Sequence, residues 1–454
     1  MDLDIRWKNF RCFEDTGWIK LRPITLLIGA NNSGKTSIID PLLLLKQSIT
    51  LRDRNLALKT KGELVNLGDF EDLVRNHNSR GTISLGLKFL PKPSGKNKKS
   101  AIGKQPPGMC EVSFRFDKAR QEIVLERYYV EDVSGRRLLE RRRNARGNYS
   151  ILGFPAIKRS RKEYLAAIKK AKPERFLFTS GPIFRIFVEA SEKRKSNRSS
   201  ISIPLGPSLY LRIVEWVKNR LYKGLTNISY IGPLREHPQR TYEVSGETPG
   251  SVGIRGEFAP EIIFRKQNDE FCKKVNVWIQ RFDFGKGLHC APLNKNTFTV
   301  KLIRKDGVSD ANLADTGFGI SQILPLIVEG LYAKKDSLII AEQPEIHLNP
   351  SLQTKLADLF CTIAKSGRRM LIETHSEHLV LRLRRLIAEG FISHKDVGLY
   401  YVNKQKGKSS VKEIVIQPNG HIENGEWPVG FFEDSLREAL GLAMLQGRKT
   451  KHAK

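Results

Sequence analysis

The pattern of hydrophobic and polar residues predicts an α/β protein. A short apolar run at Ile24–Ile28 is typical of a buried strand, and Ser337–Ile340 and Arg369–Glu373 have the same character. Residues 208–222 and 260–282 carry apolar side chains at helical spacing. This spacing predicts helices that turn one face toward a core.

The alternating pattern of residues 82–132 predicts antiparallel strands, for example at Cys110–Phe116 and Glu122–Val130. Residues 160–200 predict a charged helix followed by a linker rich in Lys and Ser. No sustained heptad pattern and no internal repeat occur. These changes of pattern divide the chain into four expected domains: 1–85, 86–200, 201–400 and 401–454.

Positive charge is concentrated in the second of these ranges. The whole chain has 78 Lys and Arg against 48 Asp and Glu. Residues 88–200 alone hold 29 Lys and Arg against 11 Asp and Glu, an excess of 18, with a dense stretch at Arg136–Arg146. The pattern favours a basic α+β insertion that meets nucleic acid or an acidic protein. The alternative is a solvated set of loops.

The apolar strand at Ile24–Ile28 runs directly into the segment GANNSGKTS. This is the phosphate-binding P-loop pattern, in which backbone N–H groups at the start of a helix surround phosphates. Lys35 is expected to reach the β- and γ-phosphates, and the Thr36 hydroxyl to hold a magnesium ion. The sequence therefore predicts ATP and Mg²⁺ as cofactors, with these nucleotide-binding residues: Gly29, Asn31, Asn32, Ser33, Gly34, Lys35, Thr36 and Ser37.

The second half of the chain holds further polar motifs at strand ends. Glu342 follows a short apolar strand, as a Walker B acid does, and is expected to help hold the magnesium ion. Upstream, the glycine-rich segment DTGFGISQILP contains Ser321 and Gln322. Downstream, another short strand ends in Thr374, His375 and Ser376.

The order of these motifs resembles the ATPase heads of the ABC class, specifically the RecF, SMC and OLD relatives. The resemblance implies an ABC-type P-loop ATPase head that forms a homodimer, in which the signature motif of one subunit closes over the nucleotide of the other. Ser321 and Gln322 match that signature, Gln47 matches the metal-binding Q-loop, and His375 matches the switch histidine. Asn349 and Pro350 fall in the D-loop region.

The tail at Trp427–Leu442 resembles the end of a bacterial group of such ATPases that carry a C-terminal domain of unknown function. Relatives of this build serve in anti-phage defence, such as AriA of the PARIS system and PtuA of Septu. The resemblance implies an oligomeric sensor that controls a separate nuclease or toxin effector. Its basic insertion would bind nucleic acid or an acidic, DNA-mimicking viral protein. A RecF-like repair ATPase that loads onto DNA by itself is the alternative.

One position departs from the pattern of the ABC class. Where most heads have a second acid after the Walker B acid, this chain has Gln343, which can orient water but cannot take its proton. Glu345 is the nearby carboxylate that could act as the base, or it caps the loop or forms a dimer contact. Slow ATP hydrolysis is therefore expected.

Other residues give weaker signals. Arg235 either reaches a phosphate or fixes a loop, and one of Trp7, Phe10 and Phe13 could stack on adenine while the others are buried. The chain has no apolar run of 18 residues, so we expect no membrane partner. The five cysteines are far apart in the sequence, which favours a cytoplasmic location.

Overall fold

A computed structural model describes residues 3–89, 106–152, 166, 168–181, 205–307 and 309–422. These residues form two compact units. Unit 1 holds the described residues of Met1–Leu21, Thr36–Ile228 and Gln405–Ser410, and unit 2 holds those of Arg22–Lys35, Ser229–Lys404 and Val411–Lys454. The division differs from the four expected ranges, because residues on both sides of the expected boundary at 85 belong to unit 1. The predicted Trp427–Leu442 motif lies outside the described residues.

The centre of unit 2 is a sheet that contains the three apolar runs predicted as strands, at 24–28, 337–340 and 369–373, together with two further strands. Its order is β10-β15-β16-β4-β17. Strand β4 lies between β16 and β17 and runs parallel to both, and β15 is parallel to β16. The bounds are β4 (Ile24–Ile28), β10 (Ile228–Ile231), β15 (Leu338–Glu342), β16 (Arg369–Glu373) and β17 (Val397–Gln405). Every residue of β4 and β15 is buried, as in strands covered on both faces.

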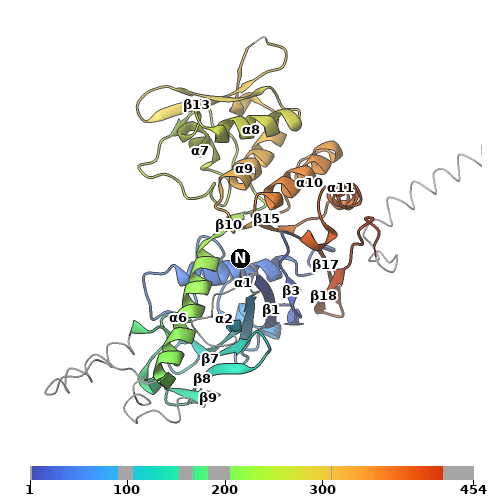
Figure 1. Ribbon diagram of the computed structural model, residues 1–454. Helices are drawn as coiled ribbons and strands as arrows, with labels where there is room; N and C mark the ends of the chain where they lie inside the picture. Colours follow the sequence, from blue (N-terminus) through green and yellow to red (C-terminus); the bar gives the residue numbers. More distant parts are fainter. Residues whose placement is uncertain are drawn as a thin grey trace, which may run out of the picture. The chain divides into compact units, whose positions relative to one another are not determined.

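The described part of unit 2 also contains five α-helices and a small antiparallel sheet. The helices are α7 (Ala259–Arg265), α8 (Glu270–Arg281), α9 (Phe318–Tyr332), α10 (Pro350–Lys365) and α11 (Glu377–Ala388). The small sheet contains β11 (Tyr242–Glu243), β12 (Gly287–Pro292), β13 (Thr297–Ile303) and β14 (Ala311–Asn312). Figure 1 shows α7, α8 and β13 together. The single helical stretch predicted at 260–282 is thus two helices, separated by a turn.

Unit 1 is built on an antiparallel sheet in the order β2-β1-β5-β6-β7-β8-β9, with β3 paired to β1. Its strands are β1 (Leu3–Phe10), β2 (Phe13–Asp15), β3 (Ile19–Lys20), β5 (Ile83–Phe89), β6 (Pro107–Asp117), β7 (Glu122–Asp132), β8 (Arg137–Arg143) and β9 (Tyr149–Leu152). The strands predicted at 110–116 and 122–130 are confirmed. They extend the sheet that begins with β1, so they do not form a separate inserted domain.

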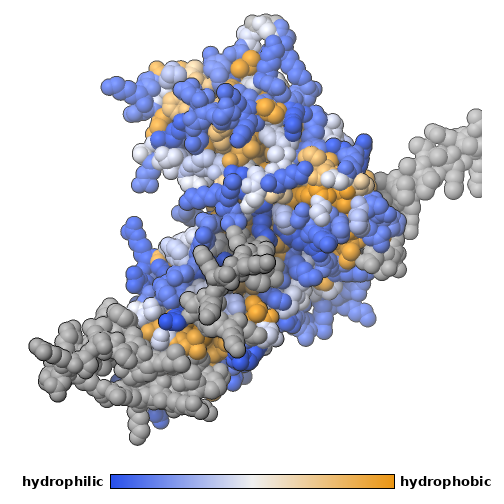
Figure 2. All heavy atoms as spheres, in the orientation of Figure 1, coloured by the Kyte–Doolittle hydropathy of each residue, from blue (hydrophilic) through white to orange (hydrophobic). Residues whose placement is uncertain are grey.

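The described part of unit 1 includes the helices α1 (Thr36–Ile49), α2 (Phe70–Leu73) and α6 (Leu205–Thr226), the last confirming the helix predicted at 208–222. Strand β18 (Lys408–Ile414) follows β17 in the chain. The α/β class predicted from the sequence is confirmed. Figure 2 shows hydrophilic residues over most of the described surface in view. Among the described residues, no helix combines the length and apolar character that a membrane crossing requires.

The aromatic residues near the N-terminus belong to the core of unit 1. Trp7, Phe10 and Phe13 are fully buried. The indole N–H of Trp7 donates a hydrogen bond to the carbonyl oxygen of Ile38 at 2.9 Å. The structure therefore favours the core alternative for all three side chains over stacking on adenine.

Only some side chains of the dense basic stretch Arg136–Arg146 are exposed. This corrects the expectation, based on charge alone, that the whole stretch forms a basic surface. Strand residues alternate between the two faces of a sheet, and Arg141 and Arg143 of β8 point inward whereas Arg142 and Arg146 are exposed. Arg141 is 0% exposed. Counting charges along the sequence cannot separate these two sets.

Candidate nucleotide-binding site

The P-loop connects the end of β4 to the start of α1, as the motif predicts. Gly29 has φ = 144°, and the carbonyl oxygen of Val402 in β17 occupies the position where a Cβ atom would lie. A residue with a side chain cannot take this position without moving β17. Asn31 and Asn32 are exposed at the tip of the loop, whereas Ser33 is buried and its hydroxyl has no hydrogen-bond partner.

Lys35 is a buried cation, with only 3% of its surface exposed. Its amine donates hydrogen bonds to the carbonyl oxygens of Ala30 at 2.8 Å and Gly29 at 3.1 Å. It also lies 4.0 Å from a carboxylate oxygen of Glu373. Burial lowers the pKa of Lys35, and the carboxylates of Glu373 and Glu345 oppose that shift. The amine is thus held within its own loop, close to two acids.

Two buried acids stand at the ends of neighbouring parallel strands. Glu342 ends β15, Glu373 ends β16, and the two residues are paired in the register of the sheet. The Tyr230 hydroxyl donates a hydrogen bond to Glu342 at 3.0 Å. Sequence reasoning did not identify Glu373 or Tyr230 as site residues. The signal for Glu373 was its place at the end of the strand before Thr374 and His375.

Arg235 fixes the loop that follows the Walker B strand. Its guanidinium donates hydrogen bonds to the backbone oxygens of Glu342 at 2.9 Å and Gln343 at 3.0 Å. Burial lowers the pKa of Arg235 to about 10, opposed by the nearby carboxylates of Glu345 and Glu342. Of the two alternatives for Arg235, the structure supports the loop-fixing one.

Gln343 and Glu345 lie in this loop and differ in character. Gln343 has φ = 43°, a left-handed backbone that side-chain-bearing residues rarely adopt, and such strain is concentrated at functional sites. Glu345 is 9% exposed. One of its oxygens accepts a hydrogen bond from the His375 amide at 2.6 Å, and the other is buried without a partner. Burial raises the pKa of Glu345, and the His375 amide opposes that rise.

His375 follows β16 and carries a buried ring nitrogen, Nε2, without a hydrogen-bond partner. Burial lowers the pKa of His375, and the positive charge of Lys35 lowers it further, so the imidazole is neutral near pH 7. Ser376 caps the N-terminus of α11, because its hydroxyl accepts a hydrogen bond from the Leu379 amide at 3.0 Å. The cap fixes the chain directly after His375.

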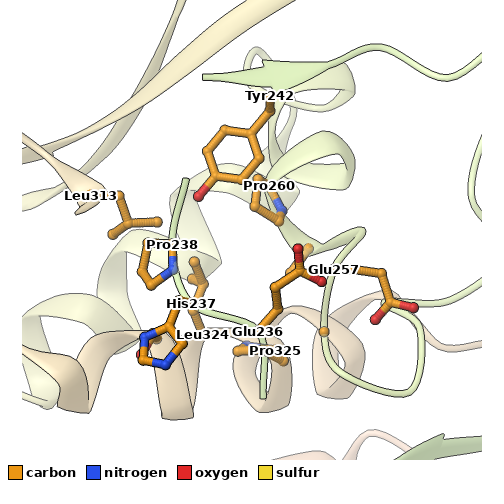
Figure 3. Close-up of a pocket in the computed structure, with 12 residues that line it drawn as sticks. Glu236, His237, Pro238, Tyr242, Glu257, Pro260, Leu313, Leu324 and Pro325 are labelled. Carbon is orange, nitrogen blue, oxygen red and sulfur yellow. The ribbon is translucent and has the colours of Figure 1, made fainter. Parts of the chain in front are cut away.

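The predicted signature residues, Ser321 and Gln322, lie near the N-terminus of α9, which begins at Phe318. The Ser321 hydroxyl donates a hydrogen bond to the carbonyl oxygen of Phe318 at 2.6 Å, and Gln322 is buried with its side-chain oxygen unpartnered. Ser321 lines a small pocket together with His237 and Leu324 (Figure 3). No hydrogen bond within the described residues links Ser321 or Gln322 to Lys35 or Glu345. The structure therefore places them in the same unit as these residues without joining them to the Lys35 cluster.

The remaining predicted metal ligands belong to unit 1. Thr36 is the first residue of α1. The Gln47 amide donates to the backbone oxygens of Lys59 at 2.5 Å and Val65 at 3.1 Å, and accepts from the Val65 amide at 3.2 Å. Gln47 thus holds a loop in this structure, and a metal-binding role for it stays a prediction. Ser37 is buried in the first turn of α1.

The buried polar atoms without partners indicate how well these residues fit a nucleotide. Within the described part of unit 2 they include Ser33 Oγ, Gln322 Oε1, Glu345 Oε2 and His375 Nε2. An unsatisfied buried polar group costs about 1–3 kcal/mol, so natural proteins keep few of them without a ligand or water. The combination of a P-loop, a lysine and unsatisfied polar atoms fits a nucleoside triphosphate. Carboxylates such as Glu342 suit Mg²⁺.

Three solved structures of SMC head domains are similar to the chain. An SMC head bound to the C-winged helix domain of ScpA has a TM-score of 0.41 and 12% identity, over 91% of this chain and 98% of that one. The SMC head domain from Thermotoga maritima has a TM-score of 0.38 and 12% identity, over 91% of this chain and 99% of that one. The third structure is an Smc head domain with an extended coiled coil bound to the C-terminal domain of ScpA, derived from Pyrococcus furiosus. It has a TM-score of 0.40 and 11% identity, over 91% of this chain and 96% of that one.

Family models give the firmer result. A family described as a protein of unknown function, DUF3696, matches residues 392–442. No curated protein matches the chain. The model of the AAA ATPase domain matches residues 3–195 and 260–380, more than half of the chain. The chain belongs to the AAA ATPase domain family.

Proposed function

We propose that the protein is a Mg²⁺-dependent ABC-class ATPase that binds ATP and hydrolyses it slowly. The observation that carries this proposal is the buried cluster at the ends of β4, β15 and β16. There Lys35 lies 4.0 Å from Glu373, and Glu345 and His375 keep unsatisfied polar atoms. The ends of neighbouring parallel strands are where α/β proteins bind ligands.

The residues of the cluster suit separate tasks. The amine of Lys35 can exchange the carbonyls of its own loop for phosphate oxygens, and the backbone N–H groups of the P-loop surround the same phosphates. Thr36 and Glu342 would hold the magnesium ion, which when bound neutralises phosphate charge. Tyr230 and Arg235 position Glu342 through its side chain and its backbone oxygen.

Glu345 is the proposed general base. It is a buried carboxylate with a raised pKa and one free oxygen, and both properties suit a group that accepts a proton near neutral pH. The Gln343 side chain can orient a water but cannot take its proton. With an amide in the usual place of the acid, turnover should be well below the roughly 10 per second of a typical enzyme.

Dimerisation is part of the proposal. The motif order supports a homodimer of heads in which Ser321 and Gln322 of one subunit meet the nucleotide of the other, and we propose that such dimers assemble into a higher homo-oligomer. The Ser321→Arg variant should keep ATP binding and lose both the ATP-dependent dimer and hydrolysis. Light scattering with and without ATP measures the dimer. Normal hydrolysis by this variant would contradict the role of the signature.

The biological role we propose is that of a sensor in bacterial anti-phage defence that controls a separate nuclease. It is supported by the resemblance of the motif order and tail, and by the positive charge of unit 1, which suits nucleic acid or an acidic viral protein. A RecF-like repair ATPase is the second candidate, favoured by the same charge. Co-purification of a nuclease with the protein supports the first role, whereas repair defects without such a partner support the second.

The experiment that tests nucleotide binding is a calorimetric titration with ATP and Mg²⁺. Wild-type protein should bind ATP, and Lys35→Ala should lose that binding while its thermal unfolding changes little. The Lys295→Ala variant is a matched control, because this lysine is exposed in the turn between β12 and β13 and is away from the P-loop in the sequence. Equal ATP affinity in wild type and Lys35→Ala would refute the proposed site.

A further inference from the structure

We propose that unit 1 contains a second, separate anion site, which binds the terminal phosphate of a nucleic-acid strand. The site is a pocket at the turns that join β6 to β7 and β8 to β9, next to residues 172–175. Its lining includes four cations, Arg120, Arg143, Lys172 and Arg175, and one acid, Glu122. All of these residues belong to unit 1, whereas Lys35 belongs to unit 2.

Two guanidinium groups of the pocket converge on one glycine. Gly147 has φ = 81°, and a Cβ atom on it would lie 3.0 Å from Nη2 of Arg120 and 3.3 Å from Nη2 of Arg143. Both nitrogen atoms therefore lie against the same small space, which exists because residue 147 has no side chain. Two like charges this close repel each other, and an anion placed between them removes that cost.

The acids nearby offset only part of this charge. Asp117 pairs with Nη1 of Arg143 at 3.0 Å, on the other arm of the guanidinium. Glu122 lies 3.6 Å from Nη1 of Arg120, and both side chains are about half exposed, so this pair is weak. The two Nη2 groups that meet at Gly147 are not the ones engaged in these pairs.

Lys172 and Arg175 supply further donors to the lining of the pocket. Lys172 is exposed and has no carboxylate partner among the residues that the structure describes. Arg175 donates from Nη2 to the backbone oxygen of Leu51, and its Nε–H is buried without a hydrogen-bond partner.

A phosphomonoester fits these donors better than a carboxylate or a phosphodiester does. It carries a charge of about −1.5 to −2 and three strong acceptor oxygens, enough to meet several cations at once. Guanidinium groups bind phosphate through two parallel hydrogen bonds. The Nη2 atoms of Arg120 and Arg143 converge on one small space at Gly147, which suits a single terminal phosphate, whereas a continuing backbone needs a groove that follows it. The inference does not depend on the proposed ATPase activity.

The test compares binding of two labelled single-stranded oligonucleotides, one with a 5′-phosphate and one with a 5′-hydroxyl. The full chain carries Lys35→Ala in all arms, so that the P-loop does not take the phosphate. We expect the phosphorylated strand to bind about tenfold more tightly, and inorganic phosphate or AMP to compete for that difference. ATP binding by the chain with Lys35 intact is measured separately. Failure of the ATP site and failure of the phosphate pocket in unit 1 can therefore be told apart.

The variants identify the pocket as the cause. Arg120→Gln with Lys172→Gln should abolish the preference for the 5′-phosphate. Lys118→Gln with Arg142→Gln removes two exposed positive charges outside the pocket lining and should keep the preference, with both strands weakened about equally. Equal affinity for the two strands, or equal loss of the preference in the two double variants, would overturn the proposal. Tighter binding of poly-glutamate that phosphate cannot displace would also overturn it.

Discussion

Lys35 and Arg141 are both buried cations, but the two regions around them are arranged in opposite ways. Arg141 donates hydrogen bonds to the Tyr210 hydroxyl at 2.6 Å and the Ile168 carbonyl at 2.9 Å, and lies 4.3 Å from the ring centre of Phe178. Lys35 donates only to carbonyl oxygens of its own loop. Glu373, Glu345 and His375 stand around Lys35, and among them Glu345 and His375 each keep one buried polar atom without a hydrogen-bond partner.

The difference in hydrogen-bond partners distinguishes Arg141, a structural cation, from Lys35, a cation available to bind phosphate. Arg141 is surrounded by groups from β9, α6 and residues 168–178, and because it is fully buried no ligand could reach it, or its unpartnered Nε–H, without unfolding unit 1. The partners of Lys35 are carbonyls that can be exchanged for other acceptors, in a loop made for phosphates. Burial alone therefore does not identify function, and the nature of the partners does.

The largest expected effect is on the free energy of unfolding, when the buried Arg141 and the exposed Arg142 are each replaced. Arg141→Glu places a carboxylate among carbonyl oxygens and aromatic rings, and should lower the free energy of unfolding by about 3–5 kcal/mol. Arg142→Glu, one residue along the same strand and exposed, should change it by no more than about 0.5 kcal/mol. Thermal and denaturant unfolding measure both. Similar losses in the two variants would show that Arg141 is not a structural cation.

The next effect concerns the pH dependence of ATP hydrolysis. Glu345 accepts a proton only as a carboxylate, so kcat/KM should fall as the pH drops through its pKa, which burial raises above 4.5. The Arg235 charge lowers that pKa. Arg235→Met should therefore move the acidic limb of the profile to higher pH, and the lost loop contacts should lower the maximum about tenfold. A limb that stays in place would exclude Glu345 as the titrating group.

The smallest effect isolates one hydrogen bond. Tyr230→Phe removes the hydroxyl that donates to Glu342 at 3.0 Å and leaves the ring in place. The loss of one such bond to a carboxylate costs about 1–1.5 kcal/mol. It should raise the Mg²⁺ concentration needed for half-maximal hydrolysis about five- to tenfold. Tyr242→Phe is the control, because its hydroxyl accepts from Gln239 instead. A Mg²⁺ dependence unchanged in Tyr230→Phe would mean that the hydroxyl does not position Glu342.

The sequence predicts the parts of the site that form continuous motifs. The P-loop, Glu342 and the strands around them are recognisable because apolar runs and glycines follow each other at fixed spacing. Glu373 was missed, because its importance comes from the pairing of β16 with β15 and β4, which the local sequence does not reveal. The buried state of Arg141 was missed for a similar reason, since it depends on α6, a helix more than sixty residues away in the chain.

The most direct test of the account is a single-turnover measurement on Glu345→Gln, which keeps the shape of the side chain and removes its ability to take a proton. The account predicts that ATP binding changes by less than about threefold while hydrolysis falls by about 10²–10⁴-fold. Gln343→Glu, the matched change in the same loop, should not lower hydrolysis. Hydrolysis by Glu345→Gln at the wild-type rate would contradict the claim that the buried cluster around Lys35 performs the reaction.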